Sequence, residues 1–287
     1  MIAHVAQSGE DRGRVVVQLG SAHPNHFALE AAVRVARAFQ SEIECVFIED
    51  AQLFDCAAYS FVREVSLTGR QRRVVSAAAM SQDLRLAEKG ARRQLEALAR
   101  RAEVPLRSRV VRDEPLRALS IACAECGPWN VVALGEPFAG GHGHLLKQLL
   151  VEISGTTGLV AVGPKAQRVT GPTVVVVEDV EGLQGMLLAA ERLAALEDNA
   201  IVLLLVAPDE EGLAELEGQA RLVLGAREDV RIELAEAARG EAGVVAEALR
   251  RLKGGFVVCQ LGGLIVPDAG DLRPLAASLE CPLLLVR

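Results

Sequence analysis

The stretches RVVVQLG (residues 14–20) and VVVVED (residues 174–179) decide the fold of this chain. Each one opens a succession of strand-like and helix-like segments. Each succession closes in a further apolar stretch, at residues 159–162 in the first half and 283–286 in the second. Strands that alternate with helices form parallel sheets through right-handed crossovers. The sequence therefore predicts that one α/β unit occurs twice.

Each half is expected to contain five strands. The first half gives 15–19, 43–48, 106–111, 130–134 and 159–162, and the second gives 173–177, 200–206, 230–235, 256–260 and 283–286. Helical spacing of apolar residues fills the intervals between them. This pattern predicts two tandem, doubly wound, five-stranded parallel sheets, for which we take the strand order to be 3-2-1-4-5. Such sheets bind ligands outside the carboxyl ends of strands 1 and 4, where the winding direction reverses.

The stretch 163–172 contains glycine and proline at both ends and has the composition of a linker. We therefore expect two domains, at 1–165 and 172–287. Each is large enough to bury a core of its own. Hydrophobic residues make up 51% of the chain and aromatic residues only 3%, so the cores must consist of aliphatic side chains. This composition suits parallel strands that helices cover on both faces.

Charge and hydropathy limit the classes of partner. Residues 173–287 carry 10 Lys/Arg and 20 Asp/Glu, whereas residues 1–172 carry 21 and 18. The second half is expected to repel polyanions, whereas the first half tolerates a phosphate. No stretch resembles a nucleic-acid-binding surface. No apolar run reaches the ~18 residues that span a bilayer, and the first residues lack the order of a signal peptide. We expect a cytoplasmic protein with no membrane partner.

The pair Cys123-x-x-Cys126 allows a redox or zinc interpretation. It lies late in a predicted helix at 114–126, where the helix dipole disfavours a thiolate. Both cysteines also share a helical stripe with Leu116 and Leu119. We therefore interpret them as core residues.

Two loops of the first half carry a resemblance to a known family. Val17-Gln18-Leu19-Gly20-Ser21 resembles the hydrophobic run and Asp-Gly-Ser that end strand 1 in universal stress proteins. The stretch 134–143 is similar to their glycine-rich turn after strand 4. The chain thus looks like a tandem universal stress protein, with an adenine nucleotide alpha-hydrolase-like fold. The resemblance implies that the halves pair about a pseudo-two-fold axis through their final strands, and it leaves a homodimer open.

The resemblance also implies a site for ATP or another adenine nucleotide in the first half. Glycines let backbone N–H groups approach a phosphate, and a helix N-terminus favours the anion. The expected cofactor-binding residues come from both loops: Gly20, Ser21, His23, Gly135, Gly140, Gly141, His142, Gly143 and His144.

The chain departs from the family pattern in three places. Leu19 stands where nucleotide-binding members carry an acidic residue, and their later Gly-Ser/Thr pair is not evident. In the second half, strand 1 runs into the acidic turn 178–181, and the stretch 261–267 offers no glycine cradle. We therefore interpret the second half as structural.

Four of the five histidines fall in the two loops of the expected site: His23, His26, His142 and His144. They allow three interpretations, namely exposed loop residues, donors to phosphate, or ligands of a transition metal. Exposure is the simplest, so a metal is not expected. Neither strand 1 is followed by a phosphate-binding Walker or dinucleotide motif. We expect a non-enzymatic protein.

An insertion at 51–80 distinguishes the first half from the second. It contains Tyr59 and Phe61, followed by Arg70, Arg72 and Arg73. These residues fit a lid over a bound nucleotide, or a helical hairpin that packs its apolar face on the sheet or on the other half. We favour packing, because scarce aromatic residues are usually needed in cores. Two further functions stay open: a scaffold that acts through protein partners, and a metal-binding sensor.

Overall fold

A computed structural model describes residues 13–19, 25–66, 68–125, 130–134, 156–227, 229–238, 241–263, 265 and 273–287. In the first half its elements are β1 (Arg14–Leu19), α1 (His26–Ala38), β2 (Glu42–Asp50), α2 (Ala51–Ala57), β3 (Arg63–Val65), β4 (Arg72–Val74), α3 (Ala77–Arg101), β5 (Leu106–Asp113), α4 (Pro115–Ala124), β6 (Asn130–Leu134) and β7 (Thr156–Ala161). In the second half they are β8 (Thr173–Val177), α6 (Leu183–Ala194), β9 (Ile201–Ala207), α7 (Glu210–Leu224), β10 (Val230–Glu236), α8 (Ala242–Leu252), β11 (Phe256–Gln260), α9 (Arg273–Ser278) and β12 (Leu283–Val286).

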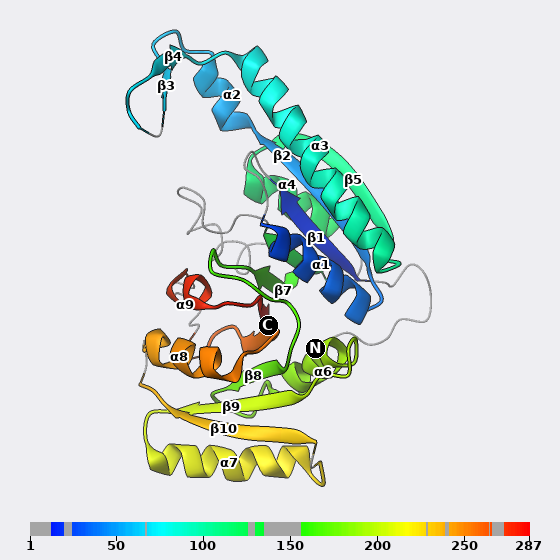
Figure 1. Cartoon of the computed structure of the whole chain (residues 1–287), viewed down its shortest axis with the longest axis vertical. Helices are drawn as coiled ribbons and strands as arrows, with labels where there is room; N and C mark the ends of the chain where they lie inside the picture. The colour runs from blue at the N-terminus through cyan, green and yellow to red at the C-terminus, as the bar shows by residue number, and fades with distance from the viewer. Residues whose placement is uncertain are drawn as a thin grey trace.

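Ten of the described strands form one continuous sheet in the order β10-β9-β8-β11-β12-β7-β6-β1-β2-β5 (Figure 1). Within each half, this order is the predicted 3-2-1-4-5. The detail that differs from the prediction is that the two five-stranded sheets merge into one. All neighbouring strands within a half run parallel, as expected.

The two halves meet at β7 and β12, which pair antiparallel as the resemblance implied. Both strands are apolar and buried, with Leu159 and Leu285 each fully buried. Either strand alone would leave an apolar edge with unpaired backbone groups. Pairing the two edges removes that exposure from both halves at once.

Helices cover both faces of the sheet. One face packs against α1, α3, α6 and α7, and the other against α4, α8 and α9. Across the middle, α1 lies beside α6. There Arg34 pairs with Glu197 at 2.5 Å, and the guanidinium of Arg192 lies 5.2 Å from the ring centroid of Phe39. No described helix combines the length and the apolar composition needed to cross a lipid bilayer.

The stretch 163–172 is packed rather than free. Ala166 and Val169 are buried, and the Gln167 N–H donates to the Glu280 carbonyl at 2.8 Å. Gly163 is fixed most tightly, because a Cβ there would lie 2.0 Å from the backbone oxygen of Ala276. The linker composition thus reflects close backbone approach instead of flexibility.

The insertion differs most from expectation. It forms α2, the β3–β4 hairpin and the first turn of α3, and it projects from one end of the molecule (Figure 1). Phe54 packs against the core, with the Arg112 guanidinium 3.8 Å from its ring centroid. Tyr59 and Phe61, however, are 58% and 76% exposed. The predicted packing of these two aromatic residues on the sheet is therefore wrong.

Candidate functional site

The predicted site begins where β1 and β6 end side by side. Gln18 lies opposite Leu134 in this parallel pair, and the winding direction of the first half reverses between the two strands. The predicted cofactor-binding residues follow these strand ends directly in the sequence. They lie outside the described residues: Gly20, Ser21, His23, Gly135, Gly140, Gly141, His142, Gly143 and His144. The structure thus brings together the two strands from which both loops start.

Helix α1 begins at the end of the first of these loops. The Asn25 side chain caps it, since its Oδ1 accepts a hydrogen bond from the Phe27 N–H at 3.0 Å. The Asn25 Nδ2 also donates to the Gly163 carbonyl at 3.5 Å. The cap fixes the helix N-terminus, whose backbone N–H groups favour anions, at the carboxyl edge of the sheet.

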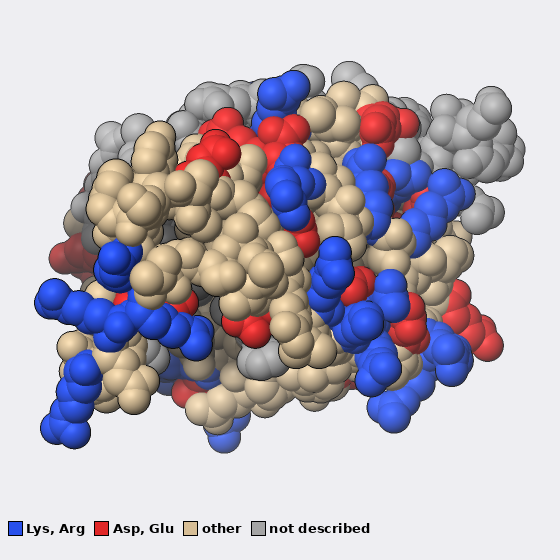
Figure 2. Space-filling model, turned by 90° about the horizontal axis from the view of Figure 1, so that it is seen from above, with Lys and Arg blue, Asp and Glu red and all other residues tan. Residues whose placement is uncertain are grey.

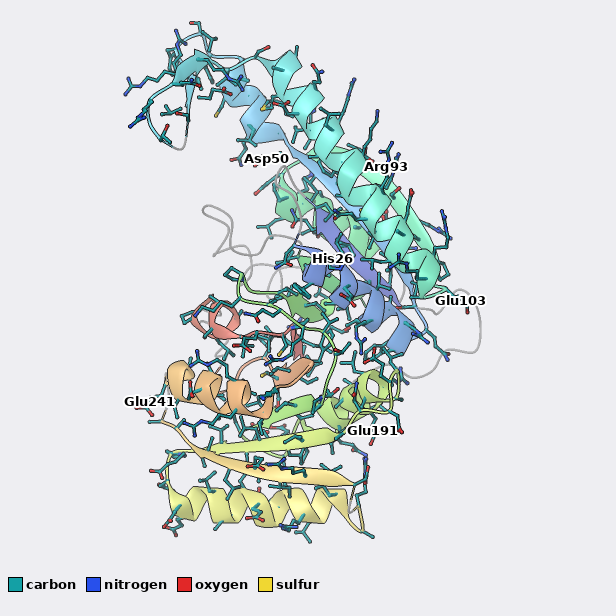
Figure 3. The ribbon with its side chains drawn as sticks, viewed as in Figure 1. His26, Asp50, Arg93, Glu103, Glu191 and Glu241 are labelled. Atoms are coloured by element: carbon teal, nitrogen blue, oxygen red, sulfur yellow. The ribbon has the colours of Figure 1, made fainter. Side chains whose placement is uncertain are left out.

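His26 is the described member of the four loop histidines (Figure 3). Its side chain is 60% exposed, and its Nε2 lies 3.6 Å from a carboxylate oxygen of Glu30 one turn along α1. Its ring meets that of Phe27 edge-on, with the centroids 5.9 Å apart. Among the described residues, no group of three or more His, Cys, Asp or Glu side chains is arranged for a metal. His26 therefore has the surroundings of a surface residue.

In the second half, an acidic residue follows the first strand directly. β1 ends at the core residue Leu19 and is followed in the sequence by Gly20, whereas β8 ends at the core residue Val177 and is followed by Glu178. The Oε1 of Glu178 accepts a hydrogen bond from the Ile265 N–H at 2.9 Å. Gly263 lies against the same carboxylate, because a Cβ there would be 2.4 Å from its Oε2.

This contact ties the end of β8 to the loop that follows β11. That loop corresponds to the glycine-rich loop after β6 in the first half. In the second half, a backbone N–H in this loop already binds an internal carboxylate, which would repel an incoming phosphate. The sequence shows the acidic turn, but only the fold identifies its partner, 87 residues away.

A groove that sequence reasoning missed runs along α6 in the second half. Its volume is about 720 Å³, and its lining includes Glu181, Gln184, Glu191, Arg227 and Gln260. Arg227 pairs with Glu191 and, at 2.7 Å, with Asp229. The hydrogen bond that Arg227 donates to Asp229 is the main cause that raises the pKa of Arg227. Of the groove's charged walls, Arg227 and Glu191 thus neutralise each other.

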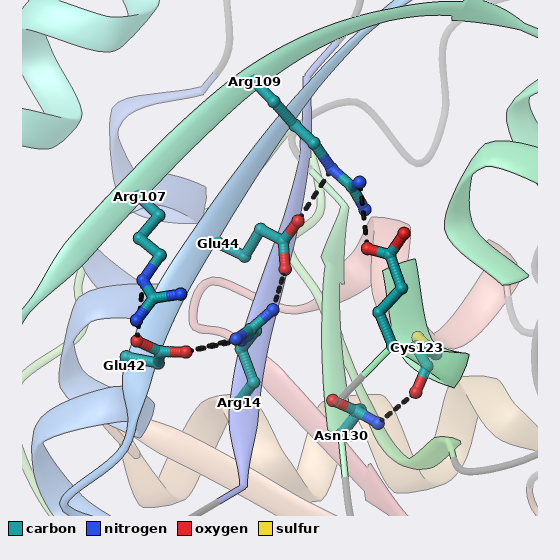
Figure 4. Close-up of polar contacts among 8 residues, drawn as sticks. Arg14, Glu42, Glu44, Arg107, Arg109, Cys123 and Asn130 are labelled. Atoms are coloured by element: carbon teal, nitrogen blue, oxygen red, sulfur yellow. Dashed lines mark hydrogen bonds and ion pairs between the residues drawn. The ribbon is translucent and has the colours of Figure 1, made fainter. Parts of the chain in front are cut away.

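A second feature that the sequence did not reveal is a charge network at the amino ends of β1, β2 and β5 (Figure 4). Arg14 binds both Glu42 and Glu44, and Arg107 lies 3.3 Å from Glu42. Arg109 joins Glu44 at 2.7 Å to Glu125 at 2.9 Å. Burial lowers the pKa of Arg14, but its bonds to the two glutamates outweigh burial and raise it overall.

The network lies at the opposite edge from the predicted site. The turns after α1 and α6 match, since Gln40 and Asp198 both have positive φ there. Arg14, Glu42 and Glu44 therefore correspond to Pro172, Ala200 and Val202 in the second half. Because apolar residues do the same work in the second half, we interpret the network as structural.

Known proteins share this architecture, although no family profile and no curated protein sequence matches the chain. A universal stress protein from Archaeoglobus fulgidus DSM 4304 superposes with a TM-score of 0.64, at 10% identity, over 96% of both chains. A putative universal stress protein from Pseudomonas aeruginosa UCBPP-PA14 gives 0.53, at 14% identity, over 95% of this chain and 92% of that one. The chain has the universal stress protein fold.

The fold of the chain is also similar to that of the cytoplasmic domain of a prokaryotic cation chloride cotransporter. It superposes with a TM-score of 0.56, at 10% identity, over 96% of this chain and 95% of that one. At such identities the comparisons show the fold alone. Since the same fold serves in proteins of different kinds, the function must be argued from the site.

Proposed function

We propose that the chain is a cytoplasmic, non-enzymatic regulatory protein of the universal stress type. Its first half binds ATP or another adenine nucleotide at the carboxyl ends of β1 and β6. Its second half supports the fold. The capped N-terminus of α1 and the glycine-rich stretch after β6 supply backbone N–H groups for the phosphates.

The observation that carries this proposal is the contact between Glu178 and Ile265. In the second half, the Glu178 carboxylate directly after β8 accepts the Ile265 N–H hydrogen bond that a phosphate oxygen could otherwise accept. In the first half, the residue directly after β1 is Gly20, which carries no charge and adds no such repulsion. One repeat therefore favours an anionic ligand, while the other contains its own anion.

Leu19 limits how a nucleotide can bind at this strand end. It is 2% exposed and belongs to the aliphatic core, so this position offers no carboxylate to a metal-bound phosphate. The affinity must then come from the phosphates and the base rather than from a magnesium bridge at this strand end. We expect ATP to bind about equally well with and without magnesium.

Isothermal titration calorimetry of the full chain with ATP tests the proposal. We expect saturable binding that falls at least about tenfold in Gly141→Asp, since a carboxylate in the loop repels phosphate. The matched control is Gly218→Asp, which adds the same charge at an open position on α7. Glu178→Gln should leave the affinity unchanged. An absence of ATP binding, or equal losses in both aspartate variants, would sink the proposal.

One observation favours a second function, the scaffold that acts through protein partners. Tyr59, Phe61, Val65 and Val74 are all more than half exposed on the projecting insertion. Exposed apolar side chains gathered in one place are typical of interaction sites. Tyrosine and arginine, both present here, are enriched among residues that dominate binding energy. This function is compatible with nucleotide binding elsewhere.

A further inference from the structure

The two ends of the long axis carry opposite charge. The insertion and α3 lie at one end, and α7 lies at the other (Figure 1). Residues 51–112 contain 13 Lys/Arg and 6 Asp/Glu, a net charge of +7, whereas residues 207–241 contain 4 and 10, a net charge of −6. Helices α3 and α7 occupy equivalent places in the two repeats, each between strands 2 and 3. The two regions thus hold equivalent positions in the fold but carry opposite net charge.

At the first end, cations collect without partners. Among the described residues of the insertion and of α3 up to Arg93, six exposed side chains form no ion pair: Arg63, Arg70, Arg72, Arg85, Lys89 and Arg93. We call them the basic end. On α3, three of the six are spaced four residues apart and therefore share one helix face. Figure 2 looks onto this end and shows Lys and Arg gathered over it, and Figure 3 shows Arg93 pointing away from the sheet.

Neighbouring acids do not neutralise this face. Glu88 and Glu96 both pair with Arg92, at 3.1 and 3.5 Å, and Arg73 pairs with Glu64 on the hairpin. Arg63 donates only to backbone, to the carbonyls of Ser60 and Val62. The guanidinium charges of the basic end therefore remain available to an outside partner.

Apolar side chains accompany these cations. The rings of Tyr59 and Phe61 lie with centroids 5.5 Å apart and are mostly exposed, and Leu86 on α3 is 62% exposed. Aromatic and arginine side chains together have the composition of an interface core, not of a merely solvated surface. A partner of this end must therefore present both acid and apolar groups.

The opposite end of the same chain meets that requirement. Its acids Asp209, Glu210, Glu211, Glu215 and Glu236 are exposed and form no ion pair among the described residues. We call them the acidic end. On the outward face of α7, Leu222 shares a stripe with Glu211 and Glu215 and is 84% exposed. Leu234 on the edge strand β10 is 49% exposed.

We propose that the basic end of one copy binds the acidic end of another. Because the two surfaces differ, the contact is heterologous and joins copies head to tail into short chains. Opposite charges at the two ends select this arrangement, since contact between like ends brings like charges together. Exposed pairs are screened by salt, so the association should weaken as ionic strength rises.

Sedimentation velocity of the full chain tests the proposal. At low salt, the weight-average mass should rise above that of the monomer over roughly a hundred-fold increase in concentration. About 1 M salt, where the Debye length falls to about 3 Å, should return it to the monomer. A chain that stays monomeric at low salt at all concentrations overturns the proposal, including the case in which it binds anionic vesicles or nucleic acid instead.

A charge swap tests the partners directly. Arg85→Glu/Arg93→Glu lowers the net charge of residues 51–112 from +7 to +3 and puts two carboxylates on the exposed face of α3. Glu211→Lys/Glu215→Lys raises that of residues 207–241 from −6 to −2 and puts two ammonium groups on the outward face of α7. Like charges then face each other in the proposed contact, so each variant alone should be monomeric. An equimolar mixture of the two should associate again. Lys165→Glu/Lys253→Glu, which changes the charge equally at exposed positions elsewhere, should behave like wild type. Circular dichroism confirms that each variant is folded. A mixture that stays monomeric while the folded wild type associates overturns the proposed pairing of ends.

Discussion

Leu159 in β7 lies directly opposite Leu285 in β12, at the point where the two repeats join. The adjacent pairs are Val160 with Leu284 and Gly158 with Val286. Leu159 lies opposite Val132 in β6, and its equivalent in the second repeat is Leu283, which lies opposite Val257 in β11. The pseudo-two-fold axis of the molecule therefore passes between Val160 and Leu284, beside the Leu159–Leu285 pair.

Truncating either leucine should destabilise the whole chain. Both are fully buried, so Leu159→Ala and Leu285→Ala should each lower the free energy of unfolding by about 2–5 kcal/mol. The two losses should not add in the double variant, because the residues are neighbours. Urea denaturation followed by circular dichroism measures this. Leu222→Ala, at an 84% exposed position, is the control and should change stability by less than about 0.5 kcal/mol.

Gly163 should tolerate no side chain. In Gly163→Ala, the added Cβ would lie 2.0 Å from the Ala276 carbonyl oxygen, and backbone cannot move aside cheaply. We expect a loss of about 1–3 kcal/mol or more. Gly218→Ala, in the open middle of α7, should instead raise stability by about 0.5–1 kcal/mol. Similar effects of the two substitutions on the thermal midpoint would contradict the packed linker.

The charge network of Arg14, Glu42 and Glu44 should affect stability mainly when one partner is removed and the others stay charged. Glu44→Leu alone leaves the buried Arg14 with one partner fewer and should cost about 3–5 kcal/mol. The triple variant Arg14→Val/Glu42→Val/Glu44→Leu replaces the three charged residues by apolar ones and should be near neutral or stabilising. Chemical denaturation compares the two proteins. A triple variant less stable than the single one would show that the network is specifically required.

The contact between Arg34 and Glu197 should add a small, pH-dependent stability. The hydrogen bond from Arg34 lowers the pKa of Glu197 below its ordinary value of 4.5. A lowered folded pKa gives stability above the unfolded pKa that is lost as the pH falls through the folded pKa. Because Glu197 is 39% exposed, the gain at neutral pH is only a few tenths to about 1 kcal/mol. Glu197→Gln should lose it at pH 7 and match wild type at strongly acidic pH, as thermal melts across this range can show.

Thiol labelling should follow burial. Burial raises the pKa of Cys45 and of Cys281 to about 12, and it raises that of Cys259 as well. Since thiolates are the reactive form, these three should resist a thiol reagent at pH 8 until denaturant is added. Cys56 on α2 is exposed and should react in the native protein. Peptide mapping by mass spectrometry identifies the labelled sites, and rapid native labelling of Cys259 would refute the packing described around β11.

Much of the fold could be predicted from local pattern. The apolar runs, their helical intervals and their repetition predicted a doubly wound parallel sheet in each half, whereas the joint through the final strands was implied by the family resemblance. Such a sheet follows from burial of aliphatic residues on both of its faces. Cys123, assigned to the core from its helical stripe, is indeed buried. The same reasoning was wrong for the insertion, because Phe54 is the one of its described aromatic residues that packs against the core.

The sequence by itself determined that one α/β unit occurs twice and that the copies differ in charge. Period and composition suffice for that, because each element carries its own signal in neighbouring residues. Only the tertiary structure decided which distant residues meet: Leu159 with Leu285, Glu178 with Ile265, and Arg14 with Glu44. Such pairs depend on register between strands far apart in the chain, and no local pattern encodes that register. For the same reason, only the tertiary structure shows that the oppositely charged segments of the two repeats lie at opposite ends of the molecule.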